Sequence, residues 1–440
     1  MEISTRLNRL QPLLEELFDL SSSPGISIGV LHEDVPAWTI HLGRRRISEP
    51  TPPDNDTLYN VASITKLMTA GVVANLVAKG LLDWDTPIRE YLSEFGERRD
   101  EVGQNATITD LLSNRTGLSA QNTFWGVMKE DIFPGAEQIP RMACHIPAIG
   151  KFRESFIYSS WGYGLVTSAI ERVTGKPFSA CVEEYIFRPL GMVRSTTNLP
   201  QSDKVVFKHW VGIDGIAHEF PWSTYRGWSD ETGFGGAVGA RTTFTGYNGS
   251  MILDPQSQTA IVVLVNSLPL FDITDVAGQL ILGAILEETN PPDYTSLSKS
   301  VRHVNTLLYD AYTAGLEKKK TEVPTQFPLK HYEGEYFDKA RIICYSVCVY
   351  GDRQLQVRVK GSSLTCYILE SWGGELFCLR PDREGELSQS MWPFTSLKSR
   401  MFMFNCSPEE VLSFTWHHDI TPGSKPETFT KDSQKSIARL

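Results

Sequence analysis

A serine and a lysine three residues apart, Ser63 and Lys66, are the residues whose spacing most directly suggests chemistry. The apolar residues after them recur at helical spacing and Gly80 provides a stop, so we predict a helix that begins at Ser63. Residues three apart on a helix share one face and lie within hydrogen-bond reach. The lysine amine could then take the proton of the serine hydroxyl as the serine attacks a carbonyl.

The position of Lys66 at the start of the helix supports this interpretation. Ser63 alone could be an ordinary helix N-cap, and Lys66 an ordinary surface lysine. The positive end of the helix dipole disfavours a lysine in the first turn, however. The same field and desolvation both lower the pKa of the amine, which suits a catalytic base. The backbone N–H of Ser63 could in addition stabilise an oxyanion.

The composition is that of an ordinary globular protein. The 440 residues, 41% hydrophobic and 21% charged, are enough for two or three cores. Lysine and arginine number 42 against 52 acidic residues, which gives a net charge of −10 and disfavours nucleic acid as a partner. Residues 1–20 lack the apolar core of a signal peptide, and no segment has the roughly 18 apolar residues of a membrane span. We therefore expect a soluble, cytoplasmic protein with no membrane partner.

The cysteines and histidines predict neither disulfides nor a metal site. The seven cysteines are odd in number, and five lie at strand-like positions late in the chain, so we expect free thiols. Cys344 and Cys348 are four apart, but no second pair with the spacing of zinc ligands accompanies them. No His-x-His or His-Glu-x-x-His pattern occurs either. We expect no metal and no other cofactor.

The pattern of hydrophobic residues separates a large N-terminal region from a smaller C-terminal one. Strands are predicted at 25–32 and 37–42, followed by a mostly helical middle and by returning strands at 250–253 and 260–265. Helical patterns follow Asp272 and span about 297–316. Strands at both ends of one region favour a single antiparallel sheet with helices packed against it.

The C-terminal region is rich in short β patterns separated by glycine-containing turns. Six strands are predicted, at 342–350, 355–359, 364–369, 376–379, 401–404 and 411–416. They indicate a small antiparallel sheet or barrel. The turn-rich segment 321–328 marks a boundary, so we predict domains at 1–320 and 329–440.

Further motifs accompany Ser63 and Lys66 along the chain, among them Tyr158-Ser159-Ser160. The segments concerned are 56–62, 111–118, 158–164, 174–178 and 189–192. In this order they resemble the penicillin-recognising serine enzymes, which include class C β-lactamases, D-alanyl-D-alanine peptidases, and β-lactamase-type esterases and acyltransferases. The resemblance covers about residues 28–288.

This resemblance implies an α+β fold of the β-lactamase/transpeptidase type, an antiparallel sheet with a helical lobe, plus a small C-terminal all-β, lipocalin-like domain. It also implies that Tyr158 relays protons between Ser63, Lys66 and the leaving group. The alternative for Tyr158 is a buried tyrosine with a satisfied hydroxyl. Ser160 stands where many members have asparagine, and it could still hydrogen-bond the lysine or the substrate.

The third motif of that family, Lys-Thr-Gly or His-x-Gly on a strand beside the nucleophile, is not visible. Residues 246–255 and 261–267 resemble the segment directly after it, which would place the motif at 240–242. Residues 234–243 instead resemble an earlier glycine-rich segment, in which case a helix and a strand are missing near 243–245. A third register places an aromatic-x-Gly variant at 233–235. None begins with lysine or histidine, and losing one oxyanion donor costs about 10²–10³ in rate.

Two functions follow from these observations. The first is a serine hydrolase or acyltransferase that acts through an acyl-enzyme on an uncharged ester, thioester or lactone, because no basic residue stands ready for a substrate carboxylate. Similar fungal members in small-molecule biosynthesis favour a role in secondary metabolism. The second is a catalytically weak or inactive relative that binds a small molecule or a partner. Tryptophans could line an apolar pocket, although loop tryptophans more often serve packing; they are Trp125, Trp210, Trp222 and Trp228.

Overall fold

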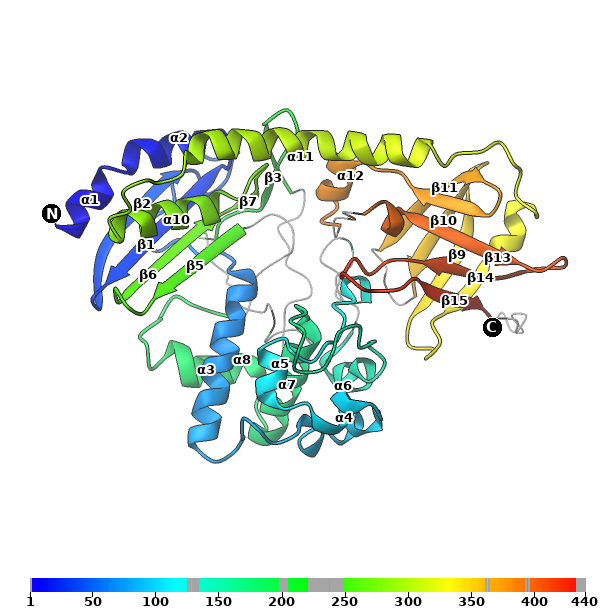
Figure 1. Ribbon diagram of the computed structural model, residues 1–440, viewed down its shortest axis with the longest axis horizontal. Helices are drawn as coiled ribbons and strands as arrows, with labels where there is room; N and C mark the ends of the chain where they lie inside the picture. Colours follow the sequence, from blue (N-terminus) through cyan, green and yellow to red (C-terminus); the bar gives the residue numbers. More distant parts are fainter. Residues whose placement is uncertain are drawn as a thin grey trace.

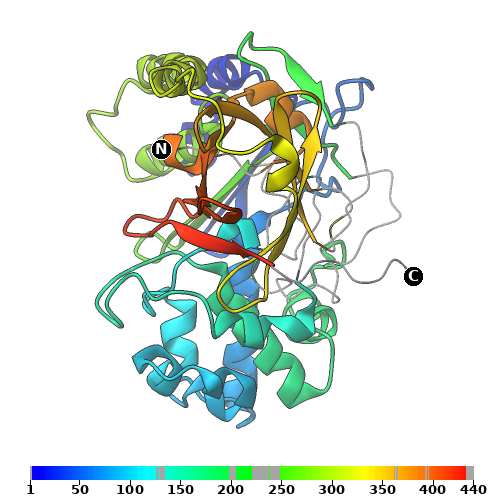
Figure 2. The same ribbon diagram turned by 90° about the vertical axis from the view of Figure 1, so that its right-hand side faces the viewer.

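The structure is a computed structural model of the chain, and it describes residues 2–124, 128, 134–197, 205–220, 237, 248–360, 362, 365–391, 394 and 396–432. Three parts are visible in Figure 1: a sheet covered by helices, a helical lobe below it, and a β-barrel beside both. Figure 2, in which the barrel faces the viewer, shows the helical lobe beneath the barrel. This arrangement confirms the expected fold class of a helix-covered antiparallel sheet with a helical lobe and a small all-β part.

The N-terminal sheet is antiparallel with the order β2-β1-β6-β5. Its strands are β1 (Gly25–His32), β2 (Val35–Gly43), β5 (Asn248–Asp254) and β6 (Thr259–Val265). The predicted hairpin is confirmed, and Glu33 and Asp34 at its turn both have positive φ, as tight hairpins require. Alternate residues of β6 are buried, among them Ile261, Val263 and Val265. The pairing of β1 with β6 thus places residues 25–32 beside residues 259–265.

Helices cover one face of this sheet. They are α1 (Ile3–Asn8), α2 (Gln11–Ser21), α10 (Ile273–Ile285) and α11 (Tyr294–Glu317). The side chain of Asp272 caps α10 by accepting hydrogen bonds from the backbone N–H groups of Thr274 and Asp275. A Cβ at Gly278 would lie 2.8 Å from the side chain of Ile252, so glycine allows α10 to approach β5 closely. The long helix α11 runs from the sheet to the barrel (Figure 1).

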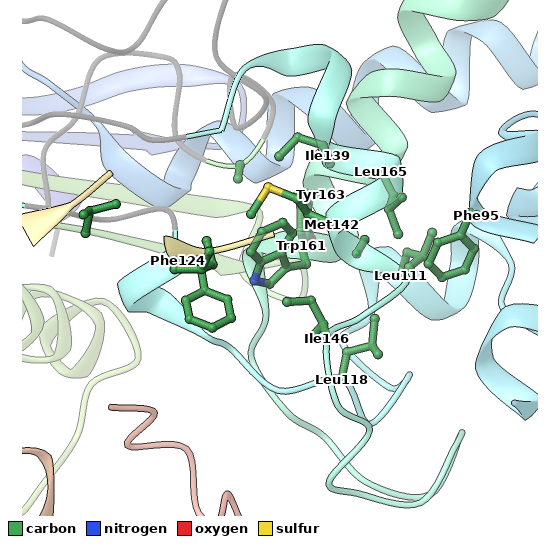
Figure 3. Packing of buried hydrophobic residues seen from close by; sticks show 14 of the residues in the cluster. Phe95, Leu111, Leu118, Phe124, Ile139, Met142, Ile146, Trp161, Tyr163 and Leu165 are labelled. Atoms are coloured by element: carbon green, nitrogen blue, oxygen red, sulfur yellow. The ribbon is translucent and has the colours of Figure 1, made fainter. Parts of the chain in front are cut away.

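The helical lobe is built from short helices around two longer ones. Its helices are α3 (Thr65–Ala78), α4 (Glu101–Asn105), α5 (Ile108–Leu112), α6 (Ile139–Ala143), α7 (Ser160–Thr174) and α8 (Phe178–Val182). Trp161 at the start of α7 is fully buried, and Figure 3 shows it among Phe124, Met142 and Ile146. A separate three-stranded sheet has the order β4-β3-β7; it consists of β3 (His209–Val211), β4 (Ala217–Glu219) and β7 (Ser267–Leu268).

The C-terminal part is a closed barrel of order β10-β11-β12-β13-β14-β15-β8-β9. Its strands are β8 (Gly334–Phe337), β9 (Cys344–Tyr350), β10 (Gln354–Val359), β11 (Cys366–Gly373), β12 (Leu376–Leu379), β13 (Met401–Cys406), β14 (Val411–Trp416) and β15 (Glu427–Lys431). The six predicted strands correspond to β9–β14, whereas β8 and β15 were missed. Buried aromatic side chains such as Tyr345, Phe414 and Trp416 fill the interior. The barrel is therefore packed around an aromatic core.

The barrel connects to the rest of the chain through buried polar contacts as well. The short helix α12 (Arg383–Ser388) carries Glu386, which pairs with fully buried Arg400 at 2.6 Å and accepts a hydrogen bond from Tyr309 of α11. All seven cysteines are free. Among the helices of the described ranges, none combines the length and the apolar character needed to cross a membrane.

Candidate active site

The nucleophile candidate lies in a tight turn that leads directly into α3. Ser63 belongs to the 3-10 turn Ala62–Ile64, and α3 begins at Thr65. The sequence placed Ser63 in the α-helix itself, so the structure corrects that detail. A 3-10 turn has three residues per turn, which brings residues i and i+3 above one another. Lys66 Nζ accordingly lies 3.1 Å from Ser63 Oγ.

Tyr158 approaches the same hydroxyl from the segment just before α7. Its phenol donates a hydrogen bond to Ser63 Oγ at 2.7 Å. The three residues that the sequence singled out for catalysis therefore meet at one point, although they come from two distant segments. Ser63 is partly buried and Tyr158 is 46% exposed, so the hydroxyl lies at an accessible place.

The environment of Lys66 lowers the pKa of its amine. The residue is 7% exposed, and Nζ also donates to the carbonyl of Ala237 at 2.8 Å. The ring centroids of Tyr158 and Tyr163 lie 4.9 and 5.1 Å from Nζ. Within the described ranges no carboxylate pairs with Lys66. Desolvation is therefore not offset by an anion, and it lowers the pKa of Lys66 to about 7.

The pKa of Tyr158 moves in the opposite direction. Desolvation raises it, and the hydrogen bond with Ser63 opposes the rise only in part. The phenol is therefore neutral at neutral pH and acts as a donor. With Tyr158 donating to Ser63 Oγ, the proton of the serine hydroxyl is free to point at the lone pair of a neutral Lys66. This arrangement prepares Ser63 for nucleophilic attack.

A loop holds the segment that carries Tyr158; we call residues 114–124 the cradle loop. The carbonyl of Asn114 accepts from Ile157 N (2.9 Å), and its side-chain oxygen accepts from Ser159 N (3.0 Å). Both neighbours of Tyr158 are thus anchored on one residue. Asn114 has a φ of 55°, a conformation that asparagine tolerates better than most residues.

A buried carboxylate fixes the start of the cradle loop. Asp110 has a fully buried side chain, and it accepts hydrogen bonds from Arg115 (2.6 Å) and Arg153 (2.9 Å). It also caps α5 through Thr107. Desolvation alone would raise the pKa of Asp110, but these hydrogen bonds keep it below its usual value. The ion pairs tie the loop to the segment that precedes Tyr158.

The sheet supports the nucleophile from the other side. Tyr59, four residues before Ser63, lies 3.0 Å from the hydroxyl of Ser27 on β1. A Cβ at Gly249 of β5 would lie 3.6 Å from the side chain of Ile64, so β5 packs against the nucleophile turn. Among the described strands, β5 is at the edge of the sheet. The segment that follows the third motif in related sequences is thus next to Ser63.

The other residues that the sequence suggested for the site, Ser160, the four tryptophans and the third motif, do not all lie within the described part of the chain. Ser160 is buried at the start of α7, and its role in substrate binding stays a prediction. Trp210 packs against Phe220, donates to Glu384 of α12 at 2.8 Å, and lines a pocket together with that glutamate. The three placements of the third motif, 233–235, 240–242 and the gap near 243–245, lie outside the described residues. So do three tryptophans, which are Trp125, Trp222 and Trp228.

Several residues that shape the site could not be identified from the sequence. Tyr163 lies in the first turn of α7, five residues after Tyr158, and its hydroxyl donates to the carbonyl of Leu112 at 2.7 Å. The carbonyl of Ala237 could not be foreseen because any residue type supplies one. Asn114 lay within a motif that was recognised, yet its contribution through the cradle loop depends on the tertiary fold. In the described part of the chain, no cluster of His, Cys, Asp and Glu could hold a metal ion.

Comparison with known proteins assigns the family. The Beta-lactamase family matches residues 10–243, just over half of the 440 residues. This chain belongs to the beta-lactamase family. Within curated proteins it is 29% identical over 195 residues to the Unguisins hydrolase ungD of Aspergillus violaceofuscus, which covers 43% of this chain and 34% of that protein. It is 24% identical over 192 residues to the D-alanyl-D-alanine-carboxypeptidase/endopeptidase AmpH of Escherichia coli, covering 43% and 49%.

Solved structures show the same fold for this beta-lactamase family member. The octameric penicillin-binding protein homologue from Pyrococcus abyssi has a TM-score of 0.52 at 17% identity, and the match covers 96% of this chain and 99% of that one. The hydrolase EstCE1, described as having promiscuous acyltransferase activity, has a TM-score of 0.53 at 14% identity, covering 64% and 99%. The matched part of this chain spans about a third of the Unguisins hydrolase.

Proposed function

We propose that this beta-lactamase family protein is a serine hydrolase or acyltransferase that forms an acyl-enzyme on Ser63. The observation that carries the proposal is the meeting of three groups: Ser63 Oγ, a Lys66 amine with a pKa near 7, and a neutral Tyr158 phenol. An amine with this pKa is about half neutral at neutral pH, which suits a general base. The family hydrolases and the hydrolase EstCE1 support the same reaction type.

The proposed reaction proceeds in two steps. Ser63 Oγ attacks the carbonyl carbon of the substrate while its proton passes to Lys66. The bond to the leaving group then breaks, and the leaving group receives that proton by way of the Tyr158 phenol. Water or an alcohol next attacks the acyl carbon while Lys66 takes its proton. The bond between that carbon and Ser63 Oγ then breaks, and Lys66 returns the proton to Ser63 Oγ. Water gives a carboxylic acid and an alcohol gives a new ester.

The proposed substrate is an uncharged ester, thioester or lactone of a small molecule. None of the sequence registers for the third motif begins with a lysine or histidine that would bind a substrate carboxylate. Lys66 is engaged with Ser63 and Ala237 and has a lowered pKa, so it is a poor partner for an anion. The similarity to the Unguisins hydrolase favours a role in secondary-metabolite biosynthesis.

The first test is labelling with a fluorophosphonate, a probe that reacts with activated serines. Wild type should be labelled and Ser63→Ala should not, while Tyr158→Phe should react at least about tenfold more slowly, because proton relay contributes about 10²–10⁴ in rate. A wild type that takes no label would show that the protein is the binding relative without catalysis.

A matched pair of esters tests the substrate class. The p-nitrophenyl esters of butyric acid and of succinic acid have acyl chains of the same carbon count, but only the second ends in a carboxylate. We expect the neutral ester to have a kcat/KM at least about tenfold higher. A preference for the succinyl ester would contradict the proposed substrate class. In a separate reaction, an added alcohol would show whether the enzyme transfers the acyl group to an acceptor other than water.

A further inference from the structure

The barrel touches the cradle loop through a small set of buried polar contacts. The contacts come from residues 418–421, which follow β14 and which we call the barrel tip. The Asp419 carboxylate accepts a hydrogen bond from the Ser119 hydroxyl, and the Thr421 hydroxyl oxygen accepts from Ala120 N at 3.3 Å. His418 Nδ1 lies 2.5 Å from the Thr123 hydroxyl. The barrel tip therefore contacts three residues of this loop, Ser119, Ala120 and Thr123.

The same residues of the cradle loop hold the segment of Tyr158. The carbonyl of Ser119 accepts from the Ser159 hydroxyl at 3.0 Å, and the carbonyl of Ala120 accepts from the Trp161 indole at 3.0 Å. Ser119 is thus bonded on both sides, to the barrel through its hydroxyl and to the neighbour of Tyr158 through its carbonyl. A continuous set of hydrogen bonds runs from Asp419 to Ser159, next to the phenol that contacts Ser63.

Burial makes these contacts specific. Asp419 is 3% exposed, and Ser119 has no exposure. Besides Ser119, Asp419 accepts from the backbone and hydroxyl of Thr421 at 3.1 and 2.6 Å. A buried carboxylate with defined donors tolerates little displacement, because an unsatisfied charge in a desolvated place is costly. The loop is therefore held in one position relative to the barrel.

Next to these contacts the described residues of the helical lobe and the barrel are not in contact. A cleft of about 1210 Å³ lies between the helical lobe and the barrel, and Gln121 and Phe124 of the cradle loop line one side of it. The imidazole of His418 stacks on Phe124 with centroids 4.7 Å apart, and its Nε2 lies 2.9 Å from Glu427 on β15. On the lobe side the loop is held by backbone hydrogen bonds such as Ser119 N to the carbonyl of Pro147 at 2.9 Å, and on the open side it is held by the barrel tip.

We propose that Asp419 of the barrel is a positioning residue of the active site, which acts through Ser119 to hold the Tyr158 phenol against Ser63. The barrel would then contribute to catalysis by positioning a residue of the active site. This inference rests on the proposed function of Ser63. The phenol must stay at hydrogen-bond distance from Ser63 Oγ, and a displacement of about 1 Å at a reacting group can cost on the order of 10² in rate.

The test compares Asp419 with a second buried aspartate of the barrel. Asp338 is 6% exposed and accepts from Ala340, Ile342 and Ile343 of its own loop, so it is a matched control that does not bond the cradle loop. Asp419→Ala should slow fluorophosphonate labelling of Ser63 by about tenfold to a hundredfold. Asp419→Asn, which keeps an acceptor oxygen for Ser119, should retain more of the rate, and Asp338→Ala should stay within about twofold of wild type.

The kinetic constants of the variants distinguish a positioning role of Asp419 from a general loss of stability. With a neutral ester, Asp419→Ala should lower kcat while KM stays near the wild-type value. Because Ser119→Ala removes the same hydrogen bond, the double variant should lose about as much as either single one, whereas independent effects would multiply. An unchanged rate in Asp419→Ala, or an equal loss in Asp338→Ala, would overturn the inference.

Hydrogen exchange tests the same coupling without any activity. In Asp419→Ala the backbone amides of Ser159 and of the cradle loop should exchange at least about tenfold faster, and in Asp338→Ala they should not. If wild type takes no label, the proposed function fails, and the exchange rates still decide whether the barrel holds the segment of Tyr158. Unchanged exchange in Asp419→Ala would contradict the positioning role.

Discussion

Replacing Lys66 with methionine should stabilise the protein at neutral pH while removing the reactivity of Ser63. Burial lowers the pKa of Lys66 from 10.5 to about 7, and the unfolded chain restores the ordinary value. The difference corresponds to about 5 kcal/mol at about 1.4 kcal/mol per pKa unit. Folding near neutral pH must therefore either bury a charge or release a proton, and both options cost free energy.

The sign of the pH dependence follows from the two pKa values. The folded pKa of Lys66 lies below the unfolded one, so the unfolded state binds more protons between about pH 7 and pH 10.5, and stability rises with pH there. The cost is fully present below pH 7 and vanishes above pH 10.5. It amounts to about 4 kcal/mol at pH 7 and to about 1 kcal/mol at pH 10.

Methionine removes this cost but leaves the carbonyl of Ala237 without the Lys66 donor. An unsatisfied buried acceptor costs about 1–3 kcal/mol, independent of pH. Lys66→Met should therefore be more stable than wild type by about 2 kcal/mol at pH 7 and less stable by about 1 kcal/mol at pH 10. The change of about 3 kcal/mol between the two pH values does not depend on the contacts that are lost.

Urea unfolding at pH 7, 8, 9 and 10 measures this change directly. Lys151→Met is the control, because the side chain of Lys151 is 79% exposed and its replacement should shift stability by nearly the same amount at each pH. If the difference between Lys66→Met and wild type is the same at pH 7 and pH 10, the amine of Lys66 has an ordinary pKa in the folded protein. Lys66 would then be protonated at neutral pH and could not act as the base.

Two further predictions concern the same site. The rate at which the fluorophosphonate labels Ser63 should rise with pH through about 7 and then level off, because Lys66 must be neutral to accept the serine proton. A rate that stays constant from pH 5.5 to 9 would contradict this role of Lys66. Asp110→Asn should lower the free energy of unfolding, measured in urea, by about 2–3 kcal/mol. The reason is that a neutral amide replaces the buried carboxylate that pairs with two half-exposed arginines, Arg115 and Arg153. A change below about 0.5 kcal/mol would show that these ion pairs contribute little.

Much of the local structure was predictable because it depends on residues close together in the chain. The hairpin of β1 and β2 follows from alternating apolar residues around a polar turn, and α10 from its Asp272 cap and apolar stripe. The strands β8 and β15 were missed because their few apolar residues form no alternating pattern; in β15 the one apolar residue is Phe429. They close the barrel by pairing Thr430 with Phe337, and a contact over that distance in the chain leaves no local pattern.

The site divides in the same way. The spacing of Ser63 and Lys66 already places an amine next to a hydroxyl, because a helical turn brings residues i and i+3 together whatever surrounds it. That Tyr158 is the third group came from resemblance to a family, since no local rule joins residues so far apart. The value of the Lys66 pKa depends on burial by Ala237 and two tyrosine rings, which only packing provides.

The sequence by itself indicated the pair of Ser63 and Lys66, the helix that begins beside it, and the presence of a helix-covered sheet followed by a β-rich region. Helical and strand periodicity act over a few residues, so they can be recognised in the chain alone. Only the tertiary structure decided how Tyr158 reaches Ser63, how deeply Lys66 is buried, and that Asp419 of the barrel contacts the loop beside the site. These properties arise from contacts between distant segments, whose energies depend on desolvation and geometry in the folded state.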